Sequence, residues 1–566
     1  MADQKISDLA ALTAITDADL LVVVDVSATE TKKVTKGDLF DGLTVGRGAG
    51  DIATNTASGY QALFTNTTGS MNTASGYQAL YANSTGFNNS ASGYQALWSN
   101  TTGNYNTAHG VQTLRLNTTG TQNTAVGFTT LHNNTTGNNN TGIGFQTLRY
   151  NTTGTGVTAS GLQALFTNTT GNNNTASGFQ ALYNNTTAAD NTGTGFQALF
   201  YNTTGATNTG TGFRALFSNT TGSMNTASGH SSLYSNTTGA GNTASGEDAL
   251  RYNTTGANNT ASGQGALYSN TTGSSLTASG QGALYSNTTG VSNTATGYRV
   301  LFTNTTGVNN TASGHSVLYN NTTGSSNTAS GTQALRFNTT GANNTASGQG
   351  ALYSNTTGSS NSASGYSALY NNTTGTSNSA YGYQALRLNT TGVSNTASGF
   401  TAGDVITTGS RNVSIGGYCD PSAAAGNDQV VIGYALVGKG NDTAFIGGTN
   451  GAYNESNSTT WQTTSDERIK KNIVDNNSGL DVLSQIKVRN FEYRTPDEIT
   501  DFSSNVAIEK DGLQLGVIAQ ELQQVLPECV SESSTGVLSV DTGPLVWHLI
   551  NAVKELKAEI QIMKGS

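Results

Sequence analysis

A serine and a lysine stand five positions apart in the segment TTSDERIKKNI, where Ser465 opens the charged part and Lys470 follows it. A serine hydroxyl becomes a nucleophile only when a base removes its proton, and a lysine amine can do this only while neutral. Burial favours the neutral amine, because desolvation lowers the pKa of a lysine. Taken alone, SDERIK is also typical of a helix start, with Ser465 or Asp466 as the N-cap and the lysine exposed.

The long middle of the chain offers little other chemistry. Between residues 52 and 403 the only carboxylates are Asp190, Glu247 and Asp248, and there is no lysine. Glycoside hydrolysis commonly needs two carboxylates that flank the bond. Glu247 and Asp248 are adjacent, and a strand would point them to opposite faces. We therefore expect no polysaccharide depolymerase activity.

Composition narrows the class of protein. Only 10% of the 566 residues are charged, 70 are glycine, and the net charge of -9 argues against nucleic acid as a partner. The 23 tyrosines and 17 phenylalanines favour periodic structure over disorder. No apolar stretch of about 18 residues could span a bilayer, and MADQKISDLA lacks the pattern of a secretory signal. We expect synthesis in a cytosol and no membrane insertion.

Cys419 and Cys529 are the only cysteines. They are too few for a disulfide framework and lack the CxxC spacing of zinc sites. Each is predicted to be a small, buried apolar side chain. The sequence predicts no metal and no cofactor.

The middle of the chain is a strict repeat. NTASGYQALFTNTTGSM begins at Asn55 and starts again at position 72, which gives a period of 17 residues. A glycine recurs in 21 registers from Gly59 to Gly399, and a leucine stands four residues after it from Leu63 to Leu386. Such strictness predicts identical rungs, each with one inward leucine.

Each repeat contains two turn signals, NTTG and SG, which leave room for two short strands. We therefore predict a β-solenoid with one coil per repeat. At about 4.8 Å per rung, 21 rungs make a rod of roughly 100 Å, with asparagine and threonine columns bonded along its axis. One coil has little apolar surface, so we infer that three chains share the core; a monomeric solenoid is the alternative.

The position after each leucine carries a flat group, beginning with Phe64, Tyr81, Trp98 and Arg115 and ending with Arg387. Period-2 alternation would place this column on the solvent side, where it could stack on sugar rings. The plainer interpretation, which we favour, is that the stacked groups stiffen the shaft.

Beyond residue 403 the pattern changes to NVSIG (412–416), QVVIG (429–433) and TAFIG (443–447). These segments resemble the rungs of the YadA-type heads of trimeric autotransporter adhesins. The resemblance implies a left-handed trimeric β-roll. It does not imply an autotransporter, because neither a secretion signal nor a C-terminal membrane barrel is recognised.

Three ordered blocks mark the last hundred residues: TTSDERIKKNI (463–473), GVIAQELQQVLPECV (516–530) and LSVDTGPLVWHLINAVKELKAEI (538–560). Together they resemble the peptidase S74 intramolecular chaperone domain of phage endosialidases, tail spikes and tail fibres. The resemblance implies that Ser465 is the nucleophile, Lys470 the base, and the bond between Thr464 and Ser465 the one cut. It implies a single self-cleavage, with no turnover of external substrates. Thr542 stands where the family often has tyrosine, which weakens the expectation of activity but not of fold.

The final helix is predicted to trimerise. Leu549, Val553, Leu556, Ile560 and Met563 follow the alternating spacing of four and three that marks a heptad seam. A seam of this kind would set three chains in register, which identical rungs cannot do by themselves.

Residues 1–45 form a separate unit. LLVVVDV (20–26) is predicted to be a strand, and TKKVTKGDLFDGL (31–43) a short helix or turn. KISDLAALTAITDADLLVVVDV resembles the N-terminal segment of tail fibre proteins of marine phages. The resemblance implies attachment to virion tail or baseplate proteins.

The predicted fold is mainly β: a trimeric β-solenoid or β-roll shaft, then a small α+β chaperone domain that ends in a coiled-coil helix. The predicted boundaries are 1–45 for virion attachment, 46–416 for the shaft, 417–464 for a distal tip, and 465–566 for the chaperone. Within the tip, Tyr418, Tyr434, Tyr453 and Trp461 interrupt the repeat and are the predicted receptor-binding residues.

These features predict a homotrimeric phage tail fibre, assembled in the host cytoplasm and carried on the virion. Its partner would be a host surface receptor, either a glycan or an outer-membrane component. The alternatives are a trimeric cell-surface adhesin and a glycan-binding or ice-binding solenoid, each with an uncleaved trimerisation domain.

Overall fold

The structure is a computed structural model that describes residues 21–23, 32–34, 43–447, 452–455, 467–495, 498–499, 510–532 and 537–565. The chain divides into two compact units, Met1–Thr463 and Thr464–Ser566. The predicted Thr464, Ser465 and Trp461 lie outside the described residues.

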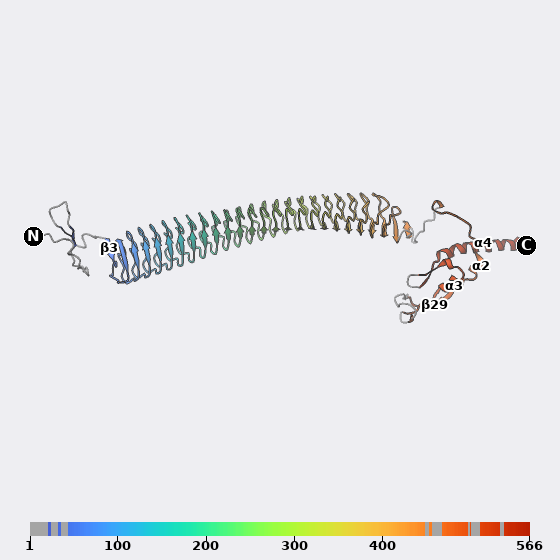
Figure 1. Cartoon of the computed structure of the whole chain (residues 1–566), viewed down its shortest axis with the longest axis horizontal. Helices are drawn as coiled ribbons and strands as arrows, with labels where there is room; N and C mark the ends of the chain where they lie inside the picture. The colour runs from blue at the N-terminus through green and yellow to red at the C-terminus, as the bar shows by residue number, and fades with distance from the viewer. Residues whose placement is uncertain are drawn as a thin grey trace, which may run out of the picture. The chain divides into compact units, whose positions relative to one another are not determined.

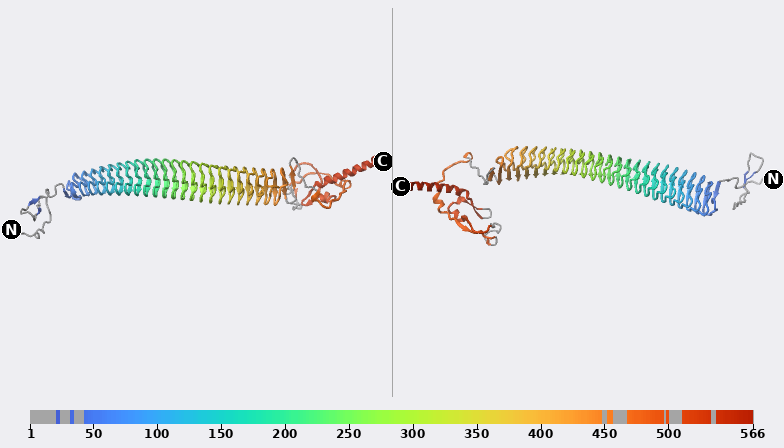
Figure 2. Two further views of the ribbon diagram at one scale, coloured as in Figure 1. Left: turned by 90° about the horizontal axis from the view of Figure 1, so that it is seen from above. Right: turned by 180° about the vertical axis from the view of Figure 1, so that it is seen from behind.

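The first unit contains a single stack of coils (Figures 1 and 2). In it, 23 successive strands each pair in parallel with the next, in register at a spacing of 17 residues, so that Thr158 faces Thr175 and Ala159 faces Ala176. The predicted solenoid of 17-residue repeats is confirmed. Its strands are β4 (Thr56–Tyr60), β5 (Thr73–Ser75), β6 (Ser90–Ser92), β7 (Thr107–His109), β8 (Thr124–Val126), β9 (Thr141–Ile143), β10 (Thr158–Ser160), β11 (Thr175–Ser177), β12 (Thr192–Thr194), β13 (Thr209–Thr211), β14 (Thr226–Ser228), β15 (Thr243–Ser245), β16 (Thr260–Ser262), β17 (Thr277–Ser279), β18 (Thr294–Thr296), β19 (Thr311–Ser313), β20 (Thr328–Ser330), β21 (Thr345–Ser347), β22 (Ser362–Ser364), β23 (Ser379–Tyr381), β24 (Thr396–Ser398), β25 (Val413–Ile415) and β26 (Val430–Gly433).

The ladder continues beyond the last recognisable NTTG repeat. Gly416 and Gly433 keep the 17-residue period, and β27 (Thr443–Gly447) then joins β26 after a shorter coil. The first part of the stretch predicted as a tip is therefore a continuation of the same parallel ladder.

An antiparallel pairing closes the ladder at each end. β3 (Leu43–Gly46) pairs with β4, and β28 (Ala452–Glu455) pairs with β27. A reversed strand stops the parallel ladder at each end, where an open edge would invite pairing with another chain. β3 runs across residues 45 and 46, where the shaft was predicted to begin.

Each coil contains one strand, not the two that the turn signals predicted. The segment after the strand follows a series of tight turns in which the glutamine and leucine positions have positive φ, 53° at Gln61 and 50° at Leu63. A left-handed conformation costs a leucine about 1–2 kcal/mol. The cost is offset because Leu63 is fully buried and its N–H bonds to the carbonyl oxygen of Ala79 on the next rung at 3.0 Å.

The apolar core lies within one chain. The strand alanines, such as Ala57, and the leucine column are buried from one end of the solenoid to the other, and Leu63 through Leu386 have no exposed surface. The inference that the core is too thin for one chain was wrong, because asparagine side chains fill the rest of the interior. The expectation of a trimer therefore rests on the C-terminal unit.

Two asparagine columns run the length of the interior. In one, Asn83 Nδ2 donates to Asn66 Oδ1 at 2.8 Å and to the carbonyl oxygen of Gly86 at 3.0 Å. In the other, Asn72 Nδ2 donates to the carbonyl oxygen of Gly86 at 2.8 Å. The threonine of each NTTG turn donates to the next rung, as Thr101 does to Thr118 at 3.0 Å. The predicted axial bonding is confirmed, and it satisfies polar groups that would be costly to bury unpaired.

Near the N-terminus, β1 (Leu21–Val23) pairs antiparallel with β2 (Lys32–Val34). β1 lies within the predicted strand. β2 lies where a helix or turn was predicted, because pairing with β1 outweighs the weak local preference of this polar segment.

The second unit is the predicted small α+β domain that ends in a long helix. Its core is formed by Leu522, Leu526 and Cys529, which are buried. Cys419 of the solenoid is also buried, so both cysteines lie where they were predicted. The elements are η2 (Glu467–Ile469), α2 (Leu480–Leu483), β29 (Arg489–Phe491), β30 (Gln514–Gly516), α3 (Ala519–Gln523), η5 (Pro527–Cys529), β31 (Val530–Glu532), β32 (Leu538–Val540) and α4 (Gly543–Gly565).

Candidate functional site

The predicted base, Lys470, directly follows the single turn η2. Its N–H donates to the carbonyl oxygen of Glu467 at 3.0 Å, and its side chain is exposed in the single chain. The predicted nucleophile Ser465 and the scissile bond from Thr464 lie outside the described residues. The roles of Ser465 as nucleophile and of the bond after Thr464 as the one cut therefore stay predictions.

Residues 476–480, which follow Lys470, form hydrogen bonds and a polar contact with one face of α4. Asn551 Nδ2 donates to the carbonyl oxygen of Asn476 at 2.6 Å, and His548 Nδ1 lies 3.0 Å from the carbonyl oxygen of Ser478. One turn further on, Glu555 accepts a hydrogen bond from the first N–H of α2. These three helix residues follow one another at intervals of three and four, so they share a face. Sequence reasoning missed them, although this spacing of polar residues was visible.

His548 is the most buried of the three and has a second polar neighbour. Its Nε2 lies 3.4 Å from Oε1 of Glu528 in η5, which leaves the ring held between Glu528 and Ser478. The contact joins α4 to the core element that contains Cys529. The long helix is thus fixed to the domain by polar contacts at specific positions.

On the other side of the domain, an ion pair connects the two-stranded sheet to α3. Arg489 of β29 makes two bonds to the carboxylate of Glu521, at 2.8 and 3.1 Å. The hydrogen bond from Arg489 lowers the pKa of Glu521 below its ordinary value, and the same bond raises the pKa of the arginine. Arg489 is exposed and Glu521 half-buried, so solvent weakens the pair and it adds orientation more than stability.

The predicted heptad seam on α4 is exposed. Leu549, Val553 and Leu556 have 55%, 58% and 44% of their surface exposed, and Ile560 and Met563 are also exposed. The neighbouring Trp547 and Val474 border an open hollow of about 630 Å³ beside the same helix. A soluble domain seldom leaves so continuous an apolar surface uncovered, and such a surface marks a site of association.

Residues 465–531 match the protein-family model described as chaperone of endosialidase, of the Peptidase S74 class. The chain carries a chaperone-of-endosialidase domain at its C-terminal end. The predicted resemblance is confirmed over this stretch, which includes Lys470 and the core elements α3 and η5. No solved structure matches the chain.

The chaperone domain extends beyond the matched residues in the structure. β32 and α4 follow the matched stretch, yet they pack against it through Val540 and Leu545 on the buried core. The helix with the exposed seam is therefore part of the same compact unit as the chaperone match.

The described residues contain neither a metal-binding cluster nor a membrane-spanning helix. Among the described residues, no group of histidine, cysteine, aspartate and glutamate is placed to hold a metal ion. No helix within the described part of the chain is long and apolar enough to cross a membrane.

The three carboxylates between residues 52 and 403 are each engaged by a different side chain. Asn173 Nδ2 donates to Asp190 at 3.2 Å, and Gln264 Nε2 donates to Glu247 at 3.1 Å. Asp248 forms an ion pair with Arg251 at 2.7 Å. None of these three arrangements places two carboxylates around a common substrate position.

The flat column predicted from the sequence forms stacked runs, one of which extends from Phe166 to Tyr234. Phe64 lies 5.4 Å from Tyr81 and nearly parallel to it, and Arg115 lies 5.0 Å above the ring of Trp98. Most of the column is half-buried between rungs, not fully on the solvent side as strand alternation suggested, because the segment is a turn and not a strand.

A second aromatic column was missed. It follows the repeat glycine, as at Tyr60, Tyr77 and Tyr94, whose rings stack at 5.2 Å and are more exposed than the first column. The signal was the tyrosine or phenylalanine that follows the SG step in most repeats.

At the distal end, Tyr418 and Tyr434 lie together. Their rings meet edge to face at 5.9 Å, and Tyr434 has 70% of its surface exposed. Tyr453 lies in β28, opposite Phe445 of β27. Two of the four predicted receptor-binding residues therefore form one exposed aromatic pair.

Proposed function

We propose that this chain is a trimeric bacteriophage tail fibre, whose solenoid is the shaft and whose chaperone domain brings three chains into register. The observation that carries the proposal is the exposed apolar seam on α4, within the compact unit that matches the endosialidase chaperone model. Three such seams can bury one another in a coiled coil.

The regularity of the shaft explains why a chaperone is needed. The rungs repeat nearly the same sequence every 17 residues and so present similar outer surfaces, and three shafts could associate one whole repeat out of register with little loss of contacts between chains. A trimeric domain at the end of the chain removes this ambiguity, because it aligns the three chains at one fixed point.

Self-cleavage before Ser465 would follow trimer formation. Lys470 is exposed in the single chain. Assembly of three domains would cover this region and favour the neutral amine that can activate Ser465. Cleavage would then separate the folded fibre from its chaperone.

The remaining parts take the roles of a tail fibre. Residues 1–45 attach the fibre to virion tail or baseplate proteins, and the exposed pair Tyr418 and Tyr434 is the part of the predicted tip that meets a host surface receptor. The fibre assembles in the host cytoplasm and acts on the virion.

The intact mass of the purified full chain tests the cleavage. We expect two fragments divided between Thr464 and Ser465 in the unchanged protein, and one full chain in Ser465→Ala and in Lys470→Ala. Lys471→Ala is the matched control, because it removes the neighbouring lysine and should still be cut. An uncut parent protein, or a cut that persists in Lys470→Ala, would remove the Ser–Lys mechanism and leave a trimerisation domain.

A further inference from the structure

On the shaft surface, the side chain two positions after the repeat glycine lies between the two aromatic columns. Glutamine is the commonest residue two positions after the repeat glycine and stands there in ten of the 21 rungs, as Gln61 follows Tyr60. Glutamines of neighbouring rungs bond along the axis; Gln78 Nε2 donates to Gln61 Oε1 at 2.8 Å. Arg214 occupies the same position in its rung and lies 5.2 Å from the rings of both Phe213 and Phe217. The side chain at this position therefore fills the space between the columns.

Two successive rungs break this pattern in the same way. Gln264 and Gln281 replace the exposed aromatic residue, and Gly265 and Gly282 replace the glutamine that follows. In these rungs the glutamines that bond along the axis stand one position earlier in the repeat, since Gln281 Nε2 donates to Gln264 Oε1 at 3.1 Å. The space between the columns loses its usual occupants.

Tyr268, Tyr285 and Phe302, which belong to the column that follows the leucines, line one side of this space. A Cβ on Gly265 would lie 3.3 Å from Cε2 of Tyr285, and one on Gly282 would lie 3.2 Å from Cε2 of Phe302. The rings stack on each other along the axis, at 4.8 Å from Tyr268 to Tyr285 and 5.0 Å from Tyr285 to Phe302. Their faces are therefore largely covered, and they present edges and hydroxyl groups to the groove.

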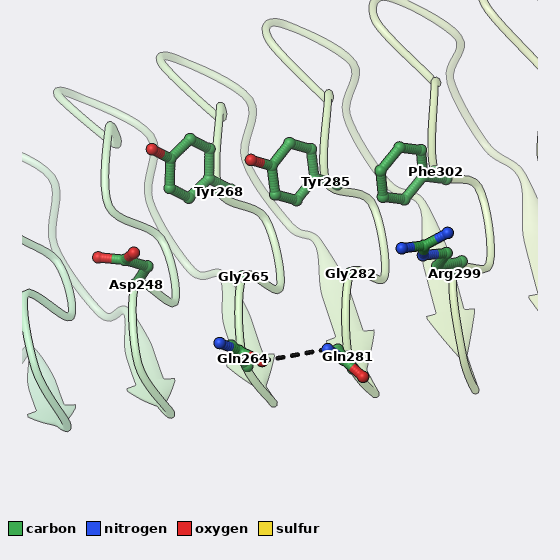
Figure 3. A pocket seen from close by; sticks show the side chains of 9 residues that line it. All are labelled: Asp248, Gln264, Gly265, Tyr268, Gln281, Gly282, Tyr285, Arg299 and Phe302. Atoms are coloured by element: carbon green, nitrogen blue, oxygen red, sulfur yellow. Dashed lines mark hydrogen bonds between the residues drawn. The ribbon is translucent and has the colours of Figure 1, made fainter.

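The result is an open groove of about 380 Å³ that runs along the shaft. Figure 3 shows the row of rings on one side, the two glutamines on the other, and the glycines between them. Asp248 stands at one end and Arg299 at the other. Four successive rungs span about 15 Å, which is enough for a short linear ligand.

The chemistry of the lining points to one class of ligand. Amide groups, tyrosine hydroxyls and ring edges can donate and accept hydrogen bonds without charge. A hydrogen bond to Tyr252 raises the pKa of Tyr268 to about 12, so its hydroxyl stays protonated. Asp248 and Arg299 are the two charged residues that line the groove and they balance each other, so the groove has no net charge to attract a polyanion.

We propose that this groove binds a neutral, hydroxyl-rich oligosaccharide that lies along the shaft axis. The groove is open and is lined by amide and hydroxyl groups, which can pair with sugar hydroxyls and suit a small apolar ligand poorly. This inference deepens the proposed attachment function, on which its biological role rests, by naming a ligand class and a second contact away from the tip.

The test restores the ordinary residue to both rungs. Gly265→Gln with Gly282→Gln places glutamine where other rungs have it, in the same left-handed conformation, since φ is 63° and 65° at the glycines and 53° at Gln61. The double variant should fold and fill the groove. Gly350→Gln is the matched control. Gly350 also follows a glutamine, but the same position holds Gln333 in the rung before and Ser367 in the rung after, so the substitution is the same and lies outside the groove.

Full-length fibre is mixed with cellohexaose, chitohexaose, maltohexaose and mannohexaose, and with a heparin hexasaccharide as the polyanion. Saturation-transfer NMR identifies the bound sugar, and calorimetry measures its affinity. We expect at least one neutral sugar to bind, with a tenfold or greater loss in the double variant and less than a twofold change in Gly350→Gln. Circular dichroism confirms that both variants fold.

Binding to none of the neutral sugars, binding to heparin alone, or equal affinity in the double variant would overturn the inference. The outcome is separable from the fibre proposal. A protein that trimerises and cleaves as expected but binds no neutral sugar contradicts the groove alone.

Discussion

Glu555 of α4 accepts a hydrogen bond from the backbone N–H of Leu480 at 2.6 Å, across 75 residues of sequence. The bond satisfies the first N–H of α2, since the first N–H groups of a helix have no acceptor within the helix. It also connects the long helix to the chain that emerges from the cleavage segment.

Replacement of Glu555 by alanine should leave this N–H without an acceptor and destabilise the chaperone domain by about 1–3 kcal/mol. Thermal unfolding of the uncleaved Ser465→Ala protein measures the loss. Glu559→Ala removes a carboxylate one turn later on the same helix and should change the stability little. Equal effects of the two substitutions would show that the contact contributes nothing.

The exposed seam should decide the oligomeric state. Leu556→Asn places an amide at the centre of the expected coiled coil and should weaken or abolish the trimer, because each of three chains loses a buried leucine. Light scattering after size-exclusion chromatography reports the mass of the particle. Lys557→Asn makes the same residue at the adjacent position and should stay trimeric. If Leu556→Asn remained as trimeric as the control, another surface would have to hold the chains together.

The buried asparagine ladder should be more important to the shaft than its exposed threonines. Asn219 donates to Asn202 and to the carbonyl oxygen of Gly222, and it accepts from Asn236. Asn219→Ala leaves these groups buried and unpaired, which should cost about 3 kcal/mol or more. Hydrogen exchange should show faster opening confined to the adjacent rungs, because each rung contacts only its neighbours.

Thr221→Ala is the control for the asparagine ladder, since Thr221 lies in the same NTTG turn and its side chain is exposed. It should leave hydrogen exchange nearly unchanged. Uniform loss of protection along the whole shaft in Asn219→Ala would contradict the local contact model.

The last rungs should become less stable as the pH rises. Burial, and then the charge of Asp404, raise the pKa of Asp420 from 3.8 to about 6. Between these values the unfolded chain releases the proton while the folded chain keeps it, so stability falls through this window and stays lower above it. Partial exposure limits the effect to roughly a tenfold loss of exchange protection between about pH 4 and pH 7.

Asp420→Asn should remove this pH dependence in exchange measurements on residues 403–437. Asp428 offers a control of the opposite sign, because its hydrogen bond with Arg411 lowers its pKa. That contribution is present above the ordinary pKa and is lost as the pH falls, so Asp428→Asn should not reproduce the behaviour of Asp420→Asn. Unchanged pH dependence in Asp420→Asn would assign the effect to another group.

The repeat itself determined the solenoid. A strict 17-residue period allows one coil per repeat, and the leucine column could be read as inward because every rung must bury the same positions. The chaperone domain and the helical seam were also visible, since spacing of four and three specifies a helix face without tertiary information.

Only the tertiary structure decided how a coil closes. Positive φ at Gln61 and Leu63 turns the predicted second strand into tight turns, and this conformation is stable only because cross-rung bonds and burial offset its local cost. The same packing showed that one chain completes its own core. It also revealed the groove at Gly265 and Gly282, where the important feature is a missing side chain between two columns that the linear sequence does not place side by side.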